Sequence, residues 1–151
     1  MKLKTLIVDD EYPARQELRF MLEDYSDKIQ IVGEAANAQE AWELIQALEY
    51  SMLFLDIDMP GLNGLELASR LQEYARGEND NAPFIVFVTA YEEFAVDAFG
   101  VNAVGYLLKP IDPDRFDKTL QKVFAWEEKR EAAATAKEAK APETAAAPAL
   151  G

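Results

Sequence analysis

The sequence predicts an α/β fold in which five βα units form a doubly wound parallel sheet. Two observations predict it. Five apolar runs alternate along the chain with segments whose apolar residues recur at helical spacing. Most of the runs are continuous rather than alternating, as in strands that helices cover on both faces. A chain of 151 residues has the length of one such domain.

The five predicted strands are short, and their order in the sheet follows from a general rule. They occupy residues 6–8, 29–32, 52–55, 84–88 and 103–108. Five strands joined by right-handed crossovers commonly take the order 2-1-3-4-5, which is the flavodoxin-like arrangement. The second run alternates between apolar and polar residues, which predicts an edge strand.

Apolar stripes predict a helix after each strand. The first four stripes run from Ala14 to Tyr25, Ala41 to Leu48, Leu67 to Ala75 and Phe94 to Phe99. The fifth helix has the clearest start, because Asp112 is a suitable N-cap and Pro113 suits the first helical position. Its stripe consists of Phe116, Leu120, Val123 and Phe124.

Composition divides the chain into a domain and a tail. From residue 131 to the end, 10 of 21 residues are Ala, with Pro142 and Pro148 among them, and few large apolar side chains remain to be buried. We therefore expect a domain over residues 1–126. Residues 127–151 are expected to hold the end of the last helix and an Ala/Pro-rich linker or disordered tail.

The residue types that are present limit the chemistry. The chain has no Cys and no His, which excludes disulfides, thiolate or imidazole metal sites and Ser-His-Asp catalysis. Its net charge of −13 disfavours binding to nucleic acid. No apolar run is long enough to span a bilayer and no secretory signal is evident, so we expect a cytoplasmic protein without membrane contact.

Polar residues follow four of the predicted strands at one edge of the sheet. They are Asp9-Asp10-Glu11, Asp56-Ile57-Asp58, Thr89-Ala90 and Lys109-Pro110. In this sheet order the first and third strands are neighbours, so Asp9, Asp10 and Asp56 converge and repel one another unless a cation intervenes. Oxygen ligands suit Mg²⁺ or Mn²⁺. A carboxylate beside such a cation, a lysine and a hydroxyl is suited to accept a phosphoryl group.

Each of these residues has a structural alternative when taken singly. Acidic pairs after strands are often helix N-caps or solvated turn residues. Thr89 alone is most often a turn hydroxyl, and Lys109 alone is most often a surface lysine. The joint placement at four strand ends is what favours the functional interpretation.

At this point the chain resembles the receiver domain of two-component response regulators. The matching stretches are LIVDDE at 6–11, FLDIDMPGLNG at 54–64, FVTAY at 87–91 and AVGYLLKPID at 103–112. The resemblance implies that Asp56 is the phosphoacceptor and that a partner sensor histidine kinase supplies the phosphoryl group. The domain would act on itself alone, catalysing its own phosphorylation and dephosphorylation, and would not be an enzyme in the usual sense.

The resemblance also implies further roles around Asp56. Asp10 and Asp56 would ligate Mg²⁺ or Mn²⁺, with Asp9 nearby and the backbone carbonyl of Asp58 as another ligand. The phosphoryl group would contact Thr89 and Lys109, with space left by Ala90, and Tyr106 would rotate with Thr89. Asp58 and Tyr91 would tune hydrolysis, and the Lys109–Pro110 bond would be cis.

The output is expected from a subgroup resemblance. Tyr12-Pro13-Ala14-Arg15 and the stretch from Phe87 to Asp112 resemble receivers that precede a LytTR-type DNA-binding domain, which act in transcription. No such domain lies within these residues. The chain is thus expected to be either part of a longer regulator, reaching DNA only through that domain, or a stand-alone receiver acting by protein contact. A homodimer through helix 4, strand 5 and helix 5 is the expected switch surface.

Two alternatives to a working receiver remain. Asp56-Ile57-Asp58 satisfies the Asp-x-Asp string of haloacid dehalogenase-like phosphatases, although the acidic pair at 9–10 precedes it. A pseudo-receiver that uses the fold without phosphorylation is the second alternative.

Overall fold

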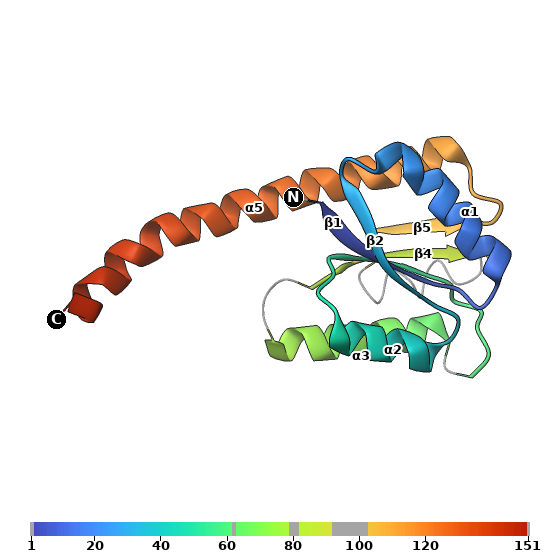
Figure 1. Cartoon of the computed structure of the whole chain (residues 1–151), viewed down its shortest axis with the longest axis horizontal. Helices are drawn as coiled ribbons and strands as arrows, with labels where there is room; N and C mark the ends of the chain where they lie inside the picture. Colours follow the sequence, from blue (N-terminus) through green and yellow to red (C-terminus); the bar gives the residue numbers. More distant parts are fainter. Residues whose placement is uncertain (1, 62, 79–81, 92–102, 151) are drawn as a thin grey trace. The chain divides into compact units, whose positions relative to one another are not determined.

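The computed structural model describes residues 2–61, 63–78, 82–91 and 103–150 (Figure 1). The chain divides into two compact units, Met1–Phe116 and Asp117–Gly151, and each is described by itself. The expected fourth helix, with Phe94 and Phe99, lies outside the described residues.

The first unit contains a five-stranded parallel sheet whose order confirms the prediction. Its order is β2-β1-β3-β4-β5. The strands are β1 (Leu3–Val8), β2 (Ile29–Ala35), β3 (Met52–Leu55), β4 (Phe84–Thr89) and β5 (Gly105–Leu108). As expected, the alternating second run forms an edge strand.

The strand bounds differ from the predicted ones in an informative way. The second strand does not end at Val32 but continues through Gly33 and Glu34 to Ala35, because it follows β1 to that strand's end at Val8. Its register shifts between Thr5 and Leu6 on the β1 side. Apolar runs did not predict this extension, because it contains a glycine and a charged residue. The extension brings Glu34 level with the end of β1.

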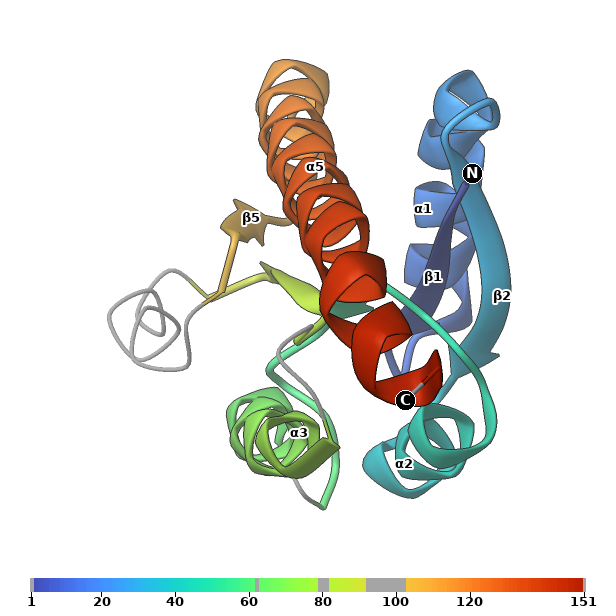
Figure 2. The same cartoon turned by 90° about the vertical axis from the view of Figure 1, so that its left-hand side faces the viewer.

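Helices cover both faces of the sheet. They are α1 (Tyr12–Leu22), followed by a single 3₁₀ turn η1 (Glu23–Tyr25), α2 (Ala38–Ala47) and α3 (Gly64–Glu78). Figure 2 shows α2 and α3 side by side below the sheet, with α1 on the opposite side. Asn37 begins α2 by accepting a hydrogen bond from the Glu40 amide at 2.9 Å.

The core forms where alternate side chains of β3 point to opposite faces. Leu53 and Leu55 are fully buried in the cluster that contains Ala41 and Leu71 of α2 and α3. On the other face, the Phe54 ring stacks on Phe116, with centroids 6.0 Å apart. The sheet is therefore packed between two apolar layers. This packing fixes the positions of the carboxyl ends of its strands.

The last helix, α5, runs over Pro113–Leu150. Asp112 accepts a hydrogen bond from the Asp114 amide through Oδ1, as an N-cap does. The helix continues through Pro142 and Pro148, where the composition led us to expect a linker or a disordered tail. The division at residue 126 stays a prediction. In the described part of the chain, no helix is both long and apolar enough to cross a membrane.

Candidate functional site

Backbone hydrogen bonds place Asp9, Asp56 and Lys109 directly beyond β1, β3 and β5, and Thr89 is the last residue of β4. The Asp9 amide donates to the carbonyl of Ala35 (3.1 Å), and the Asp56 amide donates to that of Val8 (2.9 Å). Between β4 and β5, the Lys109 amide donates to the Thr89 carbonyl at 2.8 Å. These bonds extend the strand pairing by one residue, so Thr89 and the side chains that follow β1, β3 and β5 share one edge of the sheet.

Lys109 joins the two buried carboxylates of this edge. Its Nζ lies 2.8 Å from Asp9 Oδ2 and 3.4 Å from Asp56 Oδ2. The Asp9 and Asp56 side chains are 2% and 4% exposed, against 20% for Lys109. Glu11, which is exposed, has Oε1 at 3.5 Å from the same Nζ. One ammonium group is thus shared by two carboxylates that have almost no access to water.

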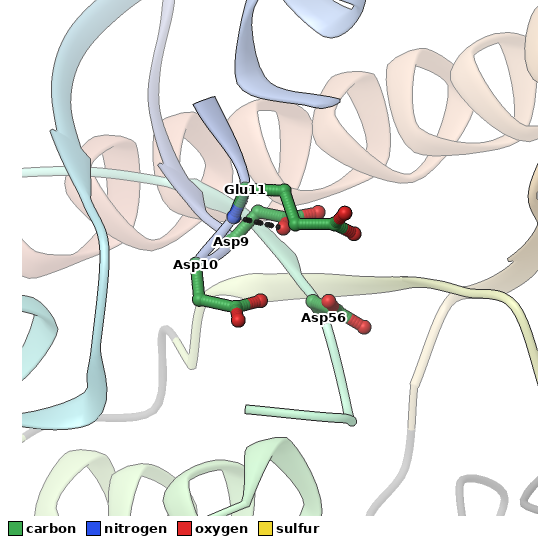
Figure 3. Close-up of side chains that lie close together, drawn as sticks. All are labelled: Asp9, Asp10, Glu11 and Asp56. Atoms are coloured by element: carbon green, nitrogen blue, oxygen red, sulfur yellow. Dashed lines mark hydrogen bonds between the residues drawn. The ribbon is translucent and has the colours of Figure 1, made fainter. Parts of the chain in front are cut away.

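Four acidic side chains gather at this point (Figure 3). Asp9, Asp10, Glu11 and Asp56 each offer a carboxylate oxygen, and these oxygens lie within 4.8 Å of one another. The loop holds itself in shape, because the Glu11 amide donates to Asp9 Oδ1 at 2.9 Å. In the same way the Asp58 amide donates to Asp56 Oδ1 at 3.2 Å.

Burial and the neighbouring acids shift the pKa values of the groups in this cluster. Burial, followed by the Asp9 charge, raises the pKa of Asp56 to about 6, although Lys109 acts in the opposite direction. Partial burial and Asp9 also raise the pKa of Asp10. Burial acts to lower the pKa of Lys109, but its hydrogen bond to Asp9 and the neighbouring charges outweigh this and hold that pKa above its ordinary value. The site therefore has more negative charge than Lys109 can balance.

The donor set fits a hard divalent cation. The four side chains of the cluster offer carboxylate oxygens, and such donors suit Mg²⁺ or Mn²⁺. Lys109 already bridges Asp9 and Asp56, which shows that these carboxylates are placed to share one positive charge. Asp10 is exposed and leaves one side of the cluster open to solvent.

The remaining predicted residues lie around this centre. Thr89 is fully buried and its Oγ1 accepts a hydrogen bond from the Tyr91 amide at 3.3 Å. The Tyr106 hydroxyl donates to the Tyr91 carbonyl, so Tyr91 links Tyr106 to Thr89. Ala90 and Asp58 are exposed. The peptide bond between Lys109 and Pro110 is cis.

A glycine allows the loop after Asp56 to turn tightly. The Gly64 amide donates to the Ile57 carbonyl at 2.9 Å, which brings the start of α3 against the backbone of Asp56. A Cβ at this position would lie 2.2 Å from the Asp56 carbonyl oxygen. The proximity of α3 to the strand end therefore requires a residue without a side chain.

Two contributors were missed from the sequence. Glu11 was counted only as part of an acidic triplet, yet it reaches both the cluster and Lys109. The Arg15 side chain donates from Nη1 to the Asp9 carbonyl at 2.6 Å. In the sequence Arg15 appeared only as part of the stretch that carries the subgroup resemblance, one turn after Glu11. Its ion pair with Glu34 depends on how far β2 extends.

Comparison with known proteins agrees with this arrangement. Residues 5–121 match the family model of the response regulator receiver domain. An uncharacterized response regulatory protein of Yersinia pestis is 50% identical over 121 residues, which cover 80% of this chain and 48% of that protein. The transcriptional regulatory protein BtsR of Escherichia coli K12 is 46% identical over the same coverage. The chain spans about half the length of these curated relatives.

Solved structures agree as well. The response regulatory domain of the protein mrkE from Klebsiella pneumoniae is 38% identical, with a TM-score of 0.74 over 83% of this chain and 99% of that one. The receiver domain of AraT from Geobacillus stearothermophilus is 32% identical, with a TM-score of 0.71 over 86% of this chain and 99% of that one. These matches favour the receiver over the haloacid dehalogenase-like alternative. By family match, relatives and fold, the chain belongs to the response regulator receiver domains.

Proposed function

We propose that this chain is a working phosphoacceptor and that Asp56 takes a phosphoryl group from a partner sensor histidine kinase. One observation carries the proposal. The Lys109 ammonium group, beyond the end of β5, lies within hydrogen-bond reach of Asp9 and Asp56, which follow β1 and β3. The complete set of groups argues against a pseudo-receiver, since an inert copy of the fold would have no need to keep two carboxylates buried against each other.

The reaction is a displacement at phosphorus. An oxygen of the Asp56 carboxylate forms the new O–P bond while the N–P bond of the donor's phosphohistidine breaks, and the leaving imidazole keeps the electron pair and takes up a proton. Because the Asp58 amide holds Asp56 Oδ1 and Lys109 reaches Oδ2, the buried carboxylate is already oriented. Lys109 then pairs with the new phosphoryl oxygens. Attack by water later returns Asp56 and inorganic phosphate.

The cation would be held by the acids of the cluster. Asp10 and Asp56 would ligate Mg²⁺ or Mn²⁺, with Asp9 nearby and the Asp58 carbonyl completing the protein ligands. When bound, the ion supplies positive charge that neutralises the phosphoryl oxygens. Asp9 and Asp10 would contribute by holding the ion, and Lys109 would pair with the phosphoryl oxygens.

The signal would leave the site through Thr89 and Tyr106. In the structure the Thr89 hydroxyl accepts from the Tyr91 amide, so a phosphoryl oxygen that accepts from this hydroxyl and draws Thr89 toward it would stretch that bond. The Tyr106 hydroxyl donates to the Tyr91 carbonyl and would move with Tyr91. Ala90 would leave space for the phosphoryl group. Tyr91 and Asp58 would set the lifetime of the phosphorylated state. A change at helix 4, strand 5 and helix 5, used for homodimerisation, is the proposed output.

The wider role is proposed by likeness. BtsR is named a transcriptional regulatory protein, and this chain matches about half of it. We propose that the receiver works in the cytoplasm and controls transcription through a LytTR-type domain, which alone would contact DNA. A receiver that acts by protein contact without such a domain is the alternative. Determining the sequence that adjoins these residues in the gene would decide between the two.

The phosphoacceptor role can be tested directly. Incubation with acetyl phosphate and Mg²⁺ should raise the intact mass by one phosphoryl group, and Asp56→Asn should abolish the gain. Chelation with EDTA should prevent it. A wild-type protein that gains no mass, or an Asp56→Asn variant that gains as much, would contradict the proposal.

Asp58→Asn provides the matched control. It removes a second, exposed carboxylate two residues away and keeps the backbone carbonyl. We expect it to accept the phosphoryl group with an altered lifetime. Loss of all phosphorylation in this variant, with turnover of phosphate esters by the wild type, would instead point to a phosphatase that uses both acids of Asp-x-Asp.

A further inference from the structure

An arginine contacts the backbone of the acidic loop. Arg15 lies in the first turns of α1, and its side chain is 14% exposed. Its Nη1 donates to the Asp9 carbonyl oxygen at 2.6 Å, while its Nε donates to Glu34 Oε1 at 3.0 Å. The guanidinium group thus connects the end of β2 to the peptide group that joins Asp9 and Asp10.

The arginine is itself held in place. Glu34 is paired through its other oxygen with Arg19 of α1, so its carboxylate is fixed from two sides. Tyr12 packs against the guanidinium group of Arg15, with the ring centroid 5.5 Å from Cζ. A group restrained by a carboxylate and a ring has little freedom left, and its remaining N–H groups have a fixed direction.

The contact acts on a peptide plane that belongs to the candidate cation site. The Asp9 carbonyl and the Asp10 amide lie in the same rigid plane. The Asp9 amide is bound to Ala35, and Asp9 Oδ1 accepts from the Glu11 amide. With the Asp9 carbonyl held as well, the position of the Asp10 Cα is set, and so is the point from which its side chain starts.

Asp10 depends on this support more than its neighbours do. Asp9 and Asp56 are buried and accept hydrogen bonds from Lys109. Asp10 is exposed, and the hydrogen bonds of the described residues include none from another side chain to its carboxylate. Its direction toward the other acids therefore comes from the backbone.

We propose that Arg15 is a positioning residue for the cation site, acting through the Asp9 carbonyl to aim the Asp10 carboxylate at the ion. The proposal rests on the proposed function in so far as Asp10 is a ligand. Arg15 does not touch the ion or the phosphoryl group. Its removal is expected to weaken cation binding and to leave phosphorylation intact once the cation is saturating.

The chain offers a matched control in Arg19. It lies one turn further along the same helix, carries the same charge and pairs with the same glutamate, yet the Asp9 carbonyl hydrogen bond comes from Arg15. The variants are Arg15→Lys, Arg15→Gln, Arg19→Lys and Arg19→Gln. Lysine keeps the charge but cannot reach two acceptors with a planar fork, so Arg15→Lys separates orientation from net charge.

The measurement is cation affinity without phosphoryl transfer. Mn²⁺ binding is read from the electron paramagnetic resonance signal of the free ion, and Mg²⁺ by competition. Loss of a residue that orients a ligand weakens metal binding by about tenfold or more, which is expected for both Arg15 variants, while the Arg19 variants stay near wild type. Wild-type affinity in the Arg15 variants, full rescue by lysine, or an equal loss in the Arg19 variants would overturn the proposal.

A second readout uses the metal-free protein. The ¹⁵N shift of the Asp10 amide reports the hydrogen bond to the carbonyl of the same peptide group, so it should move in both Arg15 variants and stay in place in the Arg19 variants. Thermal melting, recorded for all four, should show that each variant is folded at the temperature of the binding measurement. An unmoved Asp10 signal in a folded Arg15→Gln protein would contradict the positioning role.

These outcomes are separate from those of the proposed function. If the wild type binds Mn²⁺ but takes no phosphoryl group from acetyl phosphate, the proposed function fails while the role of Arg15 can still be read. If phosphorylation proceeds and the Arg15 variants bind Mn²⁺ normally, the inference alone is wrong. A wild type that binds no cation overturns both.

Discussion

At the scale of residues, the site is a set of charges that do not cancel. Lys109 serves Asp9, Glu11 and Asp56 together, and Asp10 adds a further negative charge beside them. Burial keeps water from screening the excess. The metal-free site is therefore expected to be a source of instability that a cation or a proton relieves.

Protonation of Asp56 gives a test of this instability. Its folded pKa is about 6, against an ordinary 3.8, so the folded state binds more protons than the unfolded state between these values. Stability from this group is therefore greatest at low pH and is lost as pH rises through about 6. In EDTA, Asp56→Asn should be more stable than wild type at pH 7 to 8, and the difference should shrink as pH falls toward 4.

Chemical denaturation at several pH values measures that difference. Asp27→Asn, which removes an exposed carboxylate in a turn, is the control and should follow the wild type. A gap between Asp56→Asn and wild type that does not change between pH 8 and pH 4 would show that the Asp56 charge is not disfavoured in the fold.

At the scale of elements, the sequence predicted most of what places the site. Continuous apolar runs located β1, β3 and β4, and the rule for parallel sheets located the edge where their polar residues lie. The sequence did not predict the length of β2. Gly33 and Glu34 are typical of the end of a strand, and they are part of β2 because they pair with β1. Arg15 was missed for the same reason, since its partner Glu34 is set by that register.

The start of α3 gives a prediction for an element. Gly64→Ala would put a Cβ 2.2 Å from the Asp56 carbonyl oxygen and 2.8 Å from Ile57 Cα, and both are backbone atoms. The loop must move, at a cost of about 1–3 kcal/mol in the free energy of unfolding. Because that loop orients Asp56, phosphorylation by acetyl phosphate should slow as well.

Gly33→Ala is the comparison. Its Cβ would meet the ends of the Leu6 and Leu44 side chains at 3.1 and 3.2 Å, and such side chains can shift. Its unfolding free energy should fall less, with phosphorylation unchanged. Equal effects at the two glycines would argue against a special requirement at the start of α3.

At the scale of the whole molecule, the domain and the Ala-rich end of the chain differ in how much apolar surface their sequences can bury. The family match ends at residue 121, and the Ala-rich residues at the end of α5 have little apolar surface to bury. A helix of such composition has good intrinsic propensity, yet isolated helices are marginal in water. The predicted boundary at residue 126 keeps the whole apolar stripe from Phe116 to Phe124 within the domain.

Truncation tests that boundary. A chain of residues 1–126 should keep the melting temperature and the phosphorylation rate of the full chain, because the residues removed belong to neither the apolar stripe nor the acidic cluster. Circular dichroism and intact-mass measurements give the two quantities. A large fall in melting temperature would place the domain's end later in α5.

The pairing of Lys109 with Asp9 also has a consequence for biosynthesis. These residues are separated by 100 positions, so the first strand's acids cannot meet their counter-charge until the ribosome has released the fifth strand. Contacts of such long range form late. A nascent or clipped chain that lacks residue 109 would have its acids unbalanced and no competent acceptor. Uptake of a phosphoryl group by Asp56 would then report that synthesis and folding have proceeded through Lys109, as well as reporting the incoming signal.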